Sequence, residues 1–66
     1  MERKYVIQSL IDLGYWSDSR RDFTGIIFAS RFPSVEVVED YMKESLPKFI
    51  PKQILTIIPV YEIESV

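Results

Sequence analysis

The residues best suited to binding chemistry lie between positions 15 and 23. Aromatic side chains here flank two arginines: Tyr15, Trp16, Arg20, Arg21 and Phe23. Aromatic rings can stack on nucleic-acid bases while guanidinium groups hold phosphates. The same residue types form hot spots of protein interfaces. A structural alternative places Tyr15 or Trp16 in the core under a helix and pairs the arginines with Asp18 and Asp22. We predict a partner-binding site formed by these five residues.

The charge of the chain favours a protein as that partner. The net charge is -2 and the sequence pI is about 4.9. Phosphate contacts need Lys or Arg, so nucleic-acid-binding proteins usually carry a positive excess. The basic residues are instead scattered: Arg3, Lys4, Arg20, Arg21, Arg31, Lys43, Lys48 and Lys52. A nucleic-acid-binding accessory that uses Arg20, Arg21 and the neighbouring aromatics is the alternative, and it requires these charges to gather on one face.

The residue inventory argues against catalysis. The chain has no histidine and no cysteine, which excludes His-based acid–base chemistry and zinc sites with thiolate or imidazole ligands. The hydroxyls of Ser17 and Ser19 have no base to activate them. The spacing of the aspartates at positions 12, 18 and 22 matches no calcium loop. We expect a non-enzymatic protein without catalytic residues, metal or cofactor.

An acidic cluster falls in the segment that we expect to be helical. Its carboxylates could imitate a row of phosphates and occupy a nucleic-acid-binding partner: Glu36, Glu39, Asp40 and Glu44. Lys43 interrupts the cluster, however, and a charged helix face is usually a solvated surface. We favour the solvated surface.

Length and composition indicate one domain over residues 1–66. Apolar residues make up 47% of the chain, which argues against disorder and favours apolar surface left over after folding. No apolar run approaches the ~20 residues of a membrane span, and the lack of cysteine fits the cell interior. We expect a cytoplasmic protein that does not enter membranes and that forms a homodimer through the exposed edges of a small sheet.

The first half of the chain is typical of strands. A first strand is expected at about 3–11, a turn at 12–14, a second strand starting at 15–17, a polar turn at 18–22 and a third strand at about 23–29. Gly14 suits a turn position of positive φ. Gly25, inside the third strand, predicts a bulge or a close packing contact.

The second half predicts a helix and a strand. Ser34 is the expected N-cap, and Glu36 lies near the positive end of the helix dipole. One apolar stripe follows at helical spacing: Val35, Val38, Tyr41, Met42 and Leu46. Pro47 should end the helix near residue 45 or 46. A last strand is expected at about 53–64, with Pro59 on a sheet edge or at a bulge.

These elements predict an α+β fold of order β-β-β-α-β, a small, mainly antiparallel sheet with one helix packed on one face. If the third and fourth strands share the sheet, a right-handed crossover through the helix would make them parallel. The strand order is left open.

Four segments together resemble a loose class of small bacteriophage and prophage proteins. They are Lys4-Tyr5-Val6-Ile7, Gly14-Tyr15-Trp16-Ser17, the junction from Ala29 through Phe32, Ser34 and Glu36 to Tyr41, and Pro59-Val60-Tyr61-Glu62-Ile63. Val37 departs from that class, which often has Glu there, so a reciprocal capping box is not expected. The resemblance implies a phage-derived accessory or host-modulating factor that binds a host or phage protein.

Overall fold

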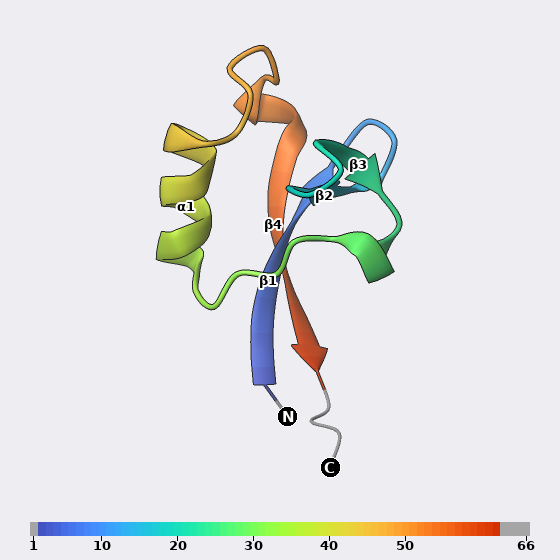
Figure 1. Ribbon diagram of the computed structural model, residues 1–66, viewed down its shortest axis with the longest axis vertical. Helices are drawn as coiled ribbons and strands as arrows, with labels where there is room; N and C mark the ends of the chain where they lie inside the picture. Colours follow the sequence, from blue (N-terminus) through green and yellow to red (C-terminus); the bar gives the residue numbers. More distant parts are fainter. Residues whose placement is uncertain (1, 63–66) are drawn as a thin grey trace.

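The computed structural model describes residues 2–62 as a sheet covered on one side by a helix (Figure 1). The strands are β1 (Glu2–Ser9), β2 (Tyr15–Ser17), β3 (Asp22–Thr24) and β4 (Leu55–Glu62), and the helix is α1 (Val35–Glu44). Two single-turn 3₁₀ helices are η1 (Ile26–Phe28) and η2 (Lys52–Ile54). The predicted α+β fold and its β-β-β-α-β order are confirmed.

The four strands lie in the order β3-β2-β1-β4, and each neighbouring pair is antiparallel. β4 therefore runs opposite to β3, and the expected parallel arrangement of these strands is wrong. The chain leaving α1 returns beyond β1 and not beside β3, so β4 pairs along the whole of β1. These two strands of eight residues form the long axis of the sheet.

The third strand is shorter than predicted and ends at Thr24. β2 has only three residues, and its pairing with β3 runs from Ser17 opposite Asp22 to Tyr15 opposite Thr24. With no partner beyond that point, the chain turns into η1, where Phe28 N donates to Gly25 O at 3.0 Å. No atom lies within 4 Å of the Cβ position at Gly25. The predicted close packing or bulge at Gly25 is therefore wrong.

The β1–β2 turn also differs from expectation, because the residue with positive φ is Leu13, at 62°. Asp12 Oδ1 accepts a hydrogen bond from Gly14 N at 2.9 Å and holds the turn. Gly14 instead lies close to β3, where an added Cβ would be 3.1 Å from Phe23 Cβ and would require a small shift of that residue. β1 itself ends at Ser9, two residues before the predicted end at Ile11.

The helix follows its sequence signals closely. Ser34 Oγ accepts from Val37 N at 3.2 Å and forms the predicted N-cap. The helix ends at Glu44 with Ser45 as its C-cap, as Pro47 predicted. Within the stripe, Val38 and Leu46 are buried, and Tyr41 and Met42 pack against the core. Val35, at the start of the stripe, is exposed.

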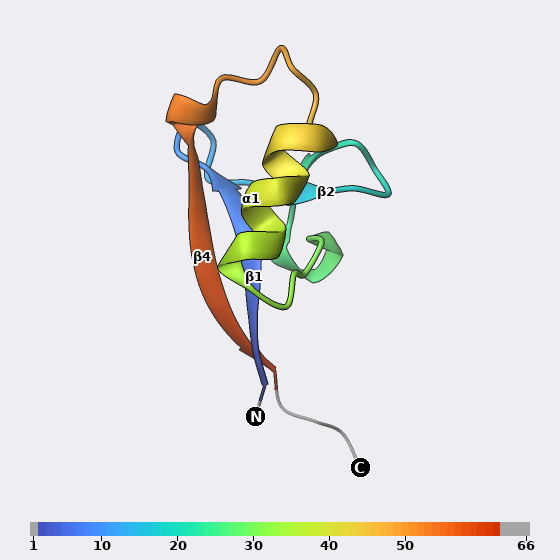
Figure 2. The same cartoon turned by 90° about the vertical axis from the view of Figure 1, so that its left-hand side faces the viewer.

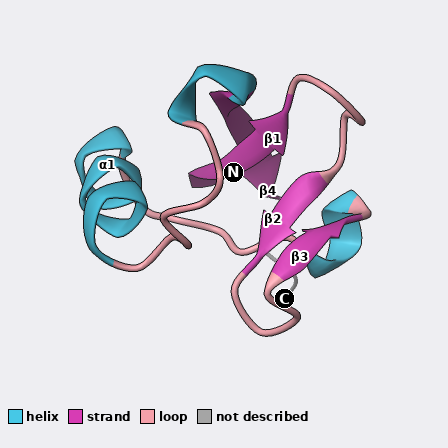
Figure 3. Ribbon diagram, turned by 90° about the horizontal axis from the view of Figure 1, so that it is seen from above, coloured by secondary structure: helices cyan, strands magenta, loops and turns pink. Residues whose placement is uncertain are grey.

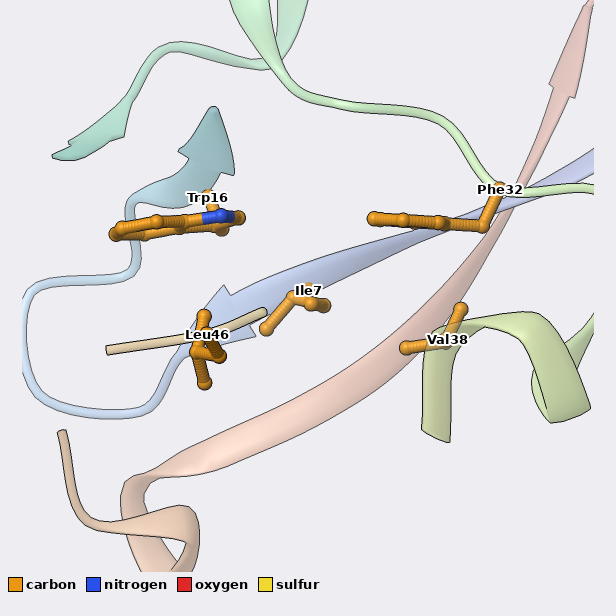
Figure 4. Close-up of a cluster of buried hydrophobic side chains, with 5 residues drawn as sticks. All are labelled: Ile7, Trp16, Phe32, Val38 and Leu46. Carbon is orange, nitrogen blue, oxygen red and sulfur yellow. The ribbon is translucent and has the colours of Figure 1, made fainter. Parts of the chain in front are cut away.

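The core lies between α1 and the sheet. Its buried side chains gather around Ile7 of β1 (Figure 4): Ile7, Trp16, Phe32, Val38 and Leu46. Phe32 reaches the core because its backbone bridges to Tyr5 through two hydrogen bonds of 2.8 and 2.9 Å. The segment before the helix thereby lies beside β1, on the same side of that strand as β2.

β4 begins at Leu55, after η2, and its described part ends at Glu62. The last two residues of the predicted strand, 63 and 64, lie outside the described residues. Pro59 lies on the edge strand, as predicted, and faces Tyr5 across the β1–β4 pair. Among residues 2–62, no helix is long and apolar enough to span a membrane.

Candidate protein-binding surface

The five residues of the predicted binding cluster do not share one surface. Trp16 is only 1% exposed and belongs to the core. Phe23 packs edge-on against it, with ring centroids 5.3 Å apart. Tyr15, adjacent to Trp16 on the strand, points to the other face of the sheet and is half-buried. Arg20 and Arg21 are exposed and contact different elements.

Arg21 belongs to a polar network that joins the β2–β3 turn to the end of α1. Trp16 Nε1 donates to the Tyr41 hydroxyl at 2.7 Å, and that hydroxyl donates to Asp18 Oδ1. Arg21 Nη1 lies 3.0 Å from the same carboxylate oxygen, and Nη2 donates to Ser45 O at 3.2 Å. A cation at the carboxyl end of a helix is favourable. The contacts of Arg21 therefore stabilise the folded chain.

The environment of Tyr41 keeps its hydroxyl protonated. Partial burial raises the pKa of Tyr41 above its ordinary value of 10.0, and the hydrogen bond to Asp18 raises it further. The phenol is thus a stable donor at neutral pH and a poor general base. Because the folded-state pKa is raised, the stability that Tyr41 contributes is complete below pH 10 and is lost as the pH rises through the folded pKa.

Replacing Tyr41 with phenylalanine tests this network. We expect Tyr41→Phe to lower the free energy of unfolding by about 1–3 kcal/mol, because Trp16 Nε1 loses its acceptor. Urea titrations at neutral pH would measure the loss, and Tyr15→Phe, a half-buried tyrosine outside the network, is the control. The variant should also show a smaller fall in stability than the native chain above pH 10. Equal stability of the two phenylalanine variants would contradict the structural role.

A second surface lies on the other side of the molecule from α1 (Figures 1 and 3). Three consecutive apolar side chains are exposed there: Ile26 at 40%, Ile27 at 74% and Phe28 at 47%. The Arg20 guanidinium lies over the Phe28 ring, 4.0 Å from its centroid. We call Arg20 and Ile26–Phe28 the η1 patch.

Hydrogen bonds and one ion pair of the residues that follow η1 hold the η1 patch in place. Arg31 Nη1 donates to Ala29 O at 2.9 Å, and its Nη2 donates to Ile26 O at 3.3 Å. Its Nε pairs with the Glu62 carboxylate of β4. Ser30 N donates to Trp16 O at 2.9 Å, and Ser30 Oγ accepts from Asp18 N at 2.7 Å. These contacts tie both ends of the turn to the sheet and reduce the ordering cost of binding.

Sequence reasoning missed the exposed residues of η1 because it placed them inside a strand. A strand with one buried face alternates apolar and polar residues. The run of Ile26, Ile27 and Phe28 does not alternate, and Gly25 precedes it. These two signals together could have indicated that the strand ends before residue 26.

The basic side chains contact different parts of the molecule, and some of them are paired with carboxylates. Three carry a carboxylate partner: Lys4 with Glu2, Arg21 with Asp18 and Arg31 with Glu62. Arg20 and Arg21 are neighbours in sequence, yet one contacts η1 and the other the end of α1. No ion pair is recorded for Arg20 within residues 2–62.

The surface near α1 has two shallow grooves of mixed character. One of about 280 Å³ lies between the helix end and the proline-containing loop 47–51, and Met42 and Leu46 are among the residues that line it. The other, of about 450 Å³, has both acidic and basic walls, Glu39 and Asp40 with Lys43 and Lys52. In the described part of the chain, no three acidic side chains gather as metal ligands.

Comparisons with protein-family models, with curated proteins and with solved structures gave no match to this chain.

Proposed function

We propose that this chain is a small non-enzymatic interaction protein that binds a protein partner through the η1 patch. The observation that carries the proposal is the Arg20 guanidinium stacked 4.0 Å over the exposed Phe28 ring, beside two exposed isoleucines. The sequence resemblance implies a phage-derived accessory or host-modulating factor, and the lack of cysteine supports a cytoplasmic location.

The composition and position of the η1 patch support protein recognition. Arginine and aromatic side chains dominate interface hot spots. Neighbouring exposed apolar side chains on a small protein mark interaction surfaces more often than isolated ones do. Ile27 remains 74% exposed after folding. A partner that buried its side chain would therefore remove further apolar area from water.

Nucleic acid is the second candidate, because a base could stack on Phe28 while Arg20 binds a phosphate. The geometry favours protein, since the guanidinium already covers one face of that ring. Dispersion of the other basic residues also argues against a phosphate-binding track. The paired cations, Lys4, Arg21 and Arg31, would have to leave their carboxylates.

Substitutions in the η1 patch should weaken the complex without unfolding the protein. We expect Arg20→Ala and Phe28→Ala each to reduce the affinity for the protein partner by about 1–3 kcal/mol. Pull-down from a lysate of the organism that encodes the chain, followed by mass spectrometry, would identify proteins retained by the native chain and lost by both variants. Lys48→Ala, in the loop after α1 and outside the η1 patch, is the control and should retain them.

Fluorescence anisotropy separates the two candidates. Labelled single-stranded DNA and RNA at low salt should show no binding to the native chain. Tight binding that falls steeply with salt and disappears in Arg20→Ala would contradict protein recognition and establish the nucleic-acid alternative. Retention of the same proteins by Phe28→Ala and the native chain would show that the η1 patch is not the binding surface.

A further inference from the structure

Alternate residues of β1 use their backbone groups on opposite sides of the strand. Tyr5 exchanges its hydrogen bonds with Phe32, and Ser9 donates to Gly14 O at 2.8 Å, so both bond toward β2. They do not bond toward β4. Tyr5 and Ser9 belong to the alternating β1 residues that bond toward β2. The β4 residues opposite these alternating residues therefore direct their own backbone N–H and carbonyl groups toward the free edge of the sheet: Leu55, Ile57, Pro59 and Tyr61.

This edge has little protection against pairing. Natural proteins blunt edge strands with charges, prolines or short length. The opposite edge strand, β3, has only three residues, whereas β4 has eight. From Leu55 to Tyr61 no side chain of β4 is charged. Pro59 removes one donor, and within residues 2–62 no strand covers the edge.

The side chains of β4 are also incompletely covered. On β1, Val6 and Ile7 are fully buried, but their partners Ile58 and Ile57 on β4 are only half-buried. For Ile57, which lies on the same face of the sheet as Ile7, Figure 2 shows the reason, because β4 runs beside α1 while the helix lies over β1. Ile58 and Val6 lie on the opposite face. Apolar area thus remains open along the same strand that has free backbone groups.

We propose that β4 pairs with β4 of a second copy of this chain, antiparallel and centred on Ile58. In this register the N–H groups of Leu55 and Tyr61 meet each other's carbonyls across the two-fold axis. The N–H of Ile57 meets the carbonyl of Pro59. Every N–H group that points outward from the edge then has an acceptor in the second copy. Because Pro59 has no N–H, only the Ile57 carbonyl stays without a protein donor and is hydrogen-bonded by water.

Neighbouring registers fit less well. Centring the pair on Pro59 places two prolines opposite each other, and neither can donate. Centring it on Ile57 places Tyr61 opposite Gln53, which belongs to η2 and not to the strand. The register on Ile58 brings together only uncharged side chains: Leu55 with Tyr61, Thr56 with Val60, Ile57 with Pro59 and Ile58 with Ile58. The interface is two-fold symmetric and uses no residue of the η1 patch.

Single cysteines test the register directly, because the native chain has none. Residues opposite each other in a non-hydrogen-bonded pair have Cα atoms about 4.5 Å apart, within the range of a disulfide. We expect Ile58→Cys to form a disulfide-linked dimer rapidly under mild oxidation. Ile57→Cys should do so more slowly, and Thr24→Cys on β3 should show only the collisional rate. Faster linkage through position 57, or equal rates at all three positions, would overturn the proposal.

A matched pair of substitutions at Tyr61 tests the backbone bonds. Tyr61→Pro removes an outward N–H that β1 does not use, and Tyr61→Ala removes only the side chain. We expect the native chain to sediment as a dimer of its 7.8 kDa subunit at high micromolar concentration. The proline variant should dissociate at least about tenfold more readily than the alanine variant. A native chain that sediments only as a monomer would overturn the proposal and leave the edge open to a strand of another protein.

Discussion

Replacing Trp16 with alanine should unfold most of the protein at room temperature. The side chain is 1% exposed, lies in the core and donates its indole N–H to Tyr41. Truncating a buried tryptophan costs about 3–5 kcal/mol. A domain of this size has only about 3–5 kcal/mol of stability in total. The two quantities are equal within their spread, so the folded population should largely disappear.

Circular dichroism and urea titration would measure this loss. Phe49→Ala is the matched control, because Phe49 is 85% exposed in the loop after α1 and its removal should leave the melting temperature nearly unchanged. A Trp16→Ala variant that melts like the native chain while losing its partner would contradict the core position and return Trp16 to the binding surface.

Replacing Val38 with aspartate should be at least as damaging. Val38 is fully buried on the core side of α1, in a cluster of apolar side chains. Burying an unpaired charge costs several kcal/mol, or raises the pKa of the introduced carboxyl until it is neutral. The variant should therefore be unfolded at neutral pH and regain part of its helical signal as the pH falls through that raised pKa toward the ordinary pKa of an aspartate.

The neighbouring residue offers a strict control for Val38→Asp. Val37 lies in the same first turn of α1 but is exposed, and a carboxylate near the amino end of a helix is favourable. Val37→Asp should thus melt within a few degrees of the native chain. Similar melting curves for the two aspartate variants would remove Val38 and its stripe from the core.

The contrast between Val37 and Val38 illustrates what local sequence could predict. Helix signals act between residues three or four positions apart, so the Ser34 cap, the stripe through Val38 and the stop before Pro47 all appear in one short segment. The short β2 strand and the polar turn that follows it were predictable for the same reason. The edge position of Pro59 was predictable from the residue itself, because proline has no N–H to donate within a sheet.

The ends of the strands and the binding surface depended on residues far apart in the chain. Thr24 ends β3 because β2 has no further residue to pair with, and the following apolar run becomes the exposed η1 turn. Arg20 and Arg21 have the same chemistry in the sequence. In the folded chain, Arg20 lies over Phe28 in the η1 patch, whereas Arg21 donates to Ser45 O at the end of α1. The positions of these two partners are set by the tertiary structure.

Sequence by itself thus determined the fold class, the order of the elements and the helix with its cap and stop, because these follow from backbone preferences and contacts within a single turn. The tertiary structure alone decided that β4 pairs with β1, and which apolar side chains stay in water. Strand pairing joins residues such as Val6 and Ile58, which are separated by most of the chain. Its outcome depends on which edges remain free once the other strands have paired.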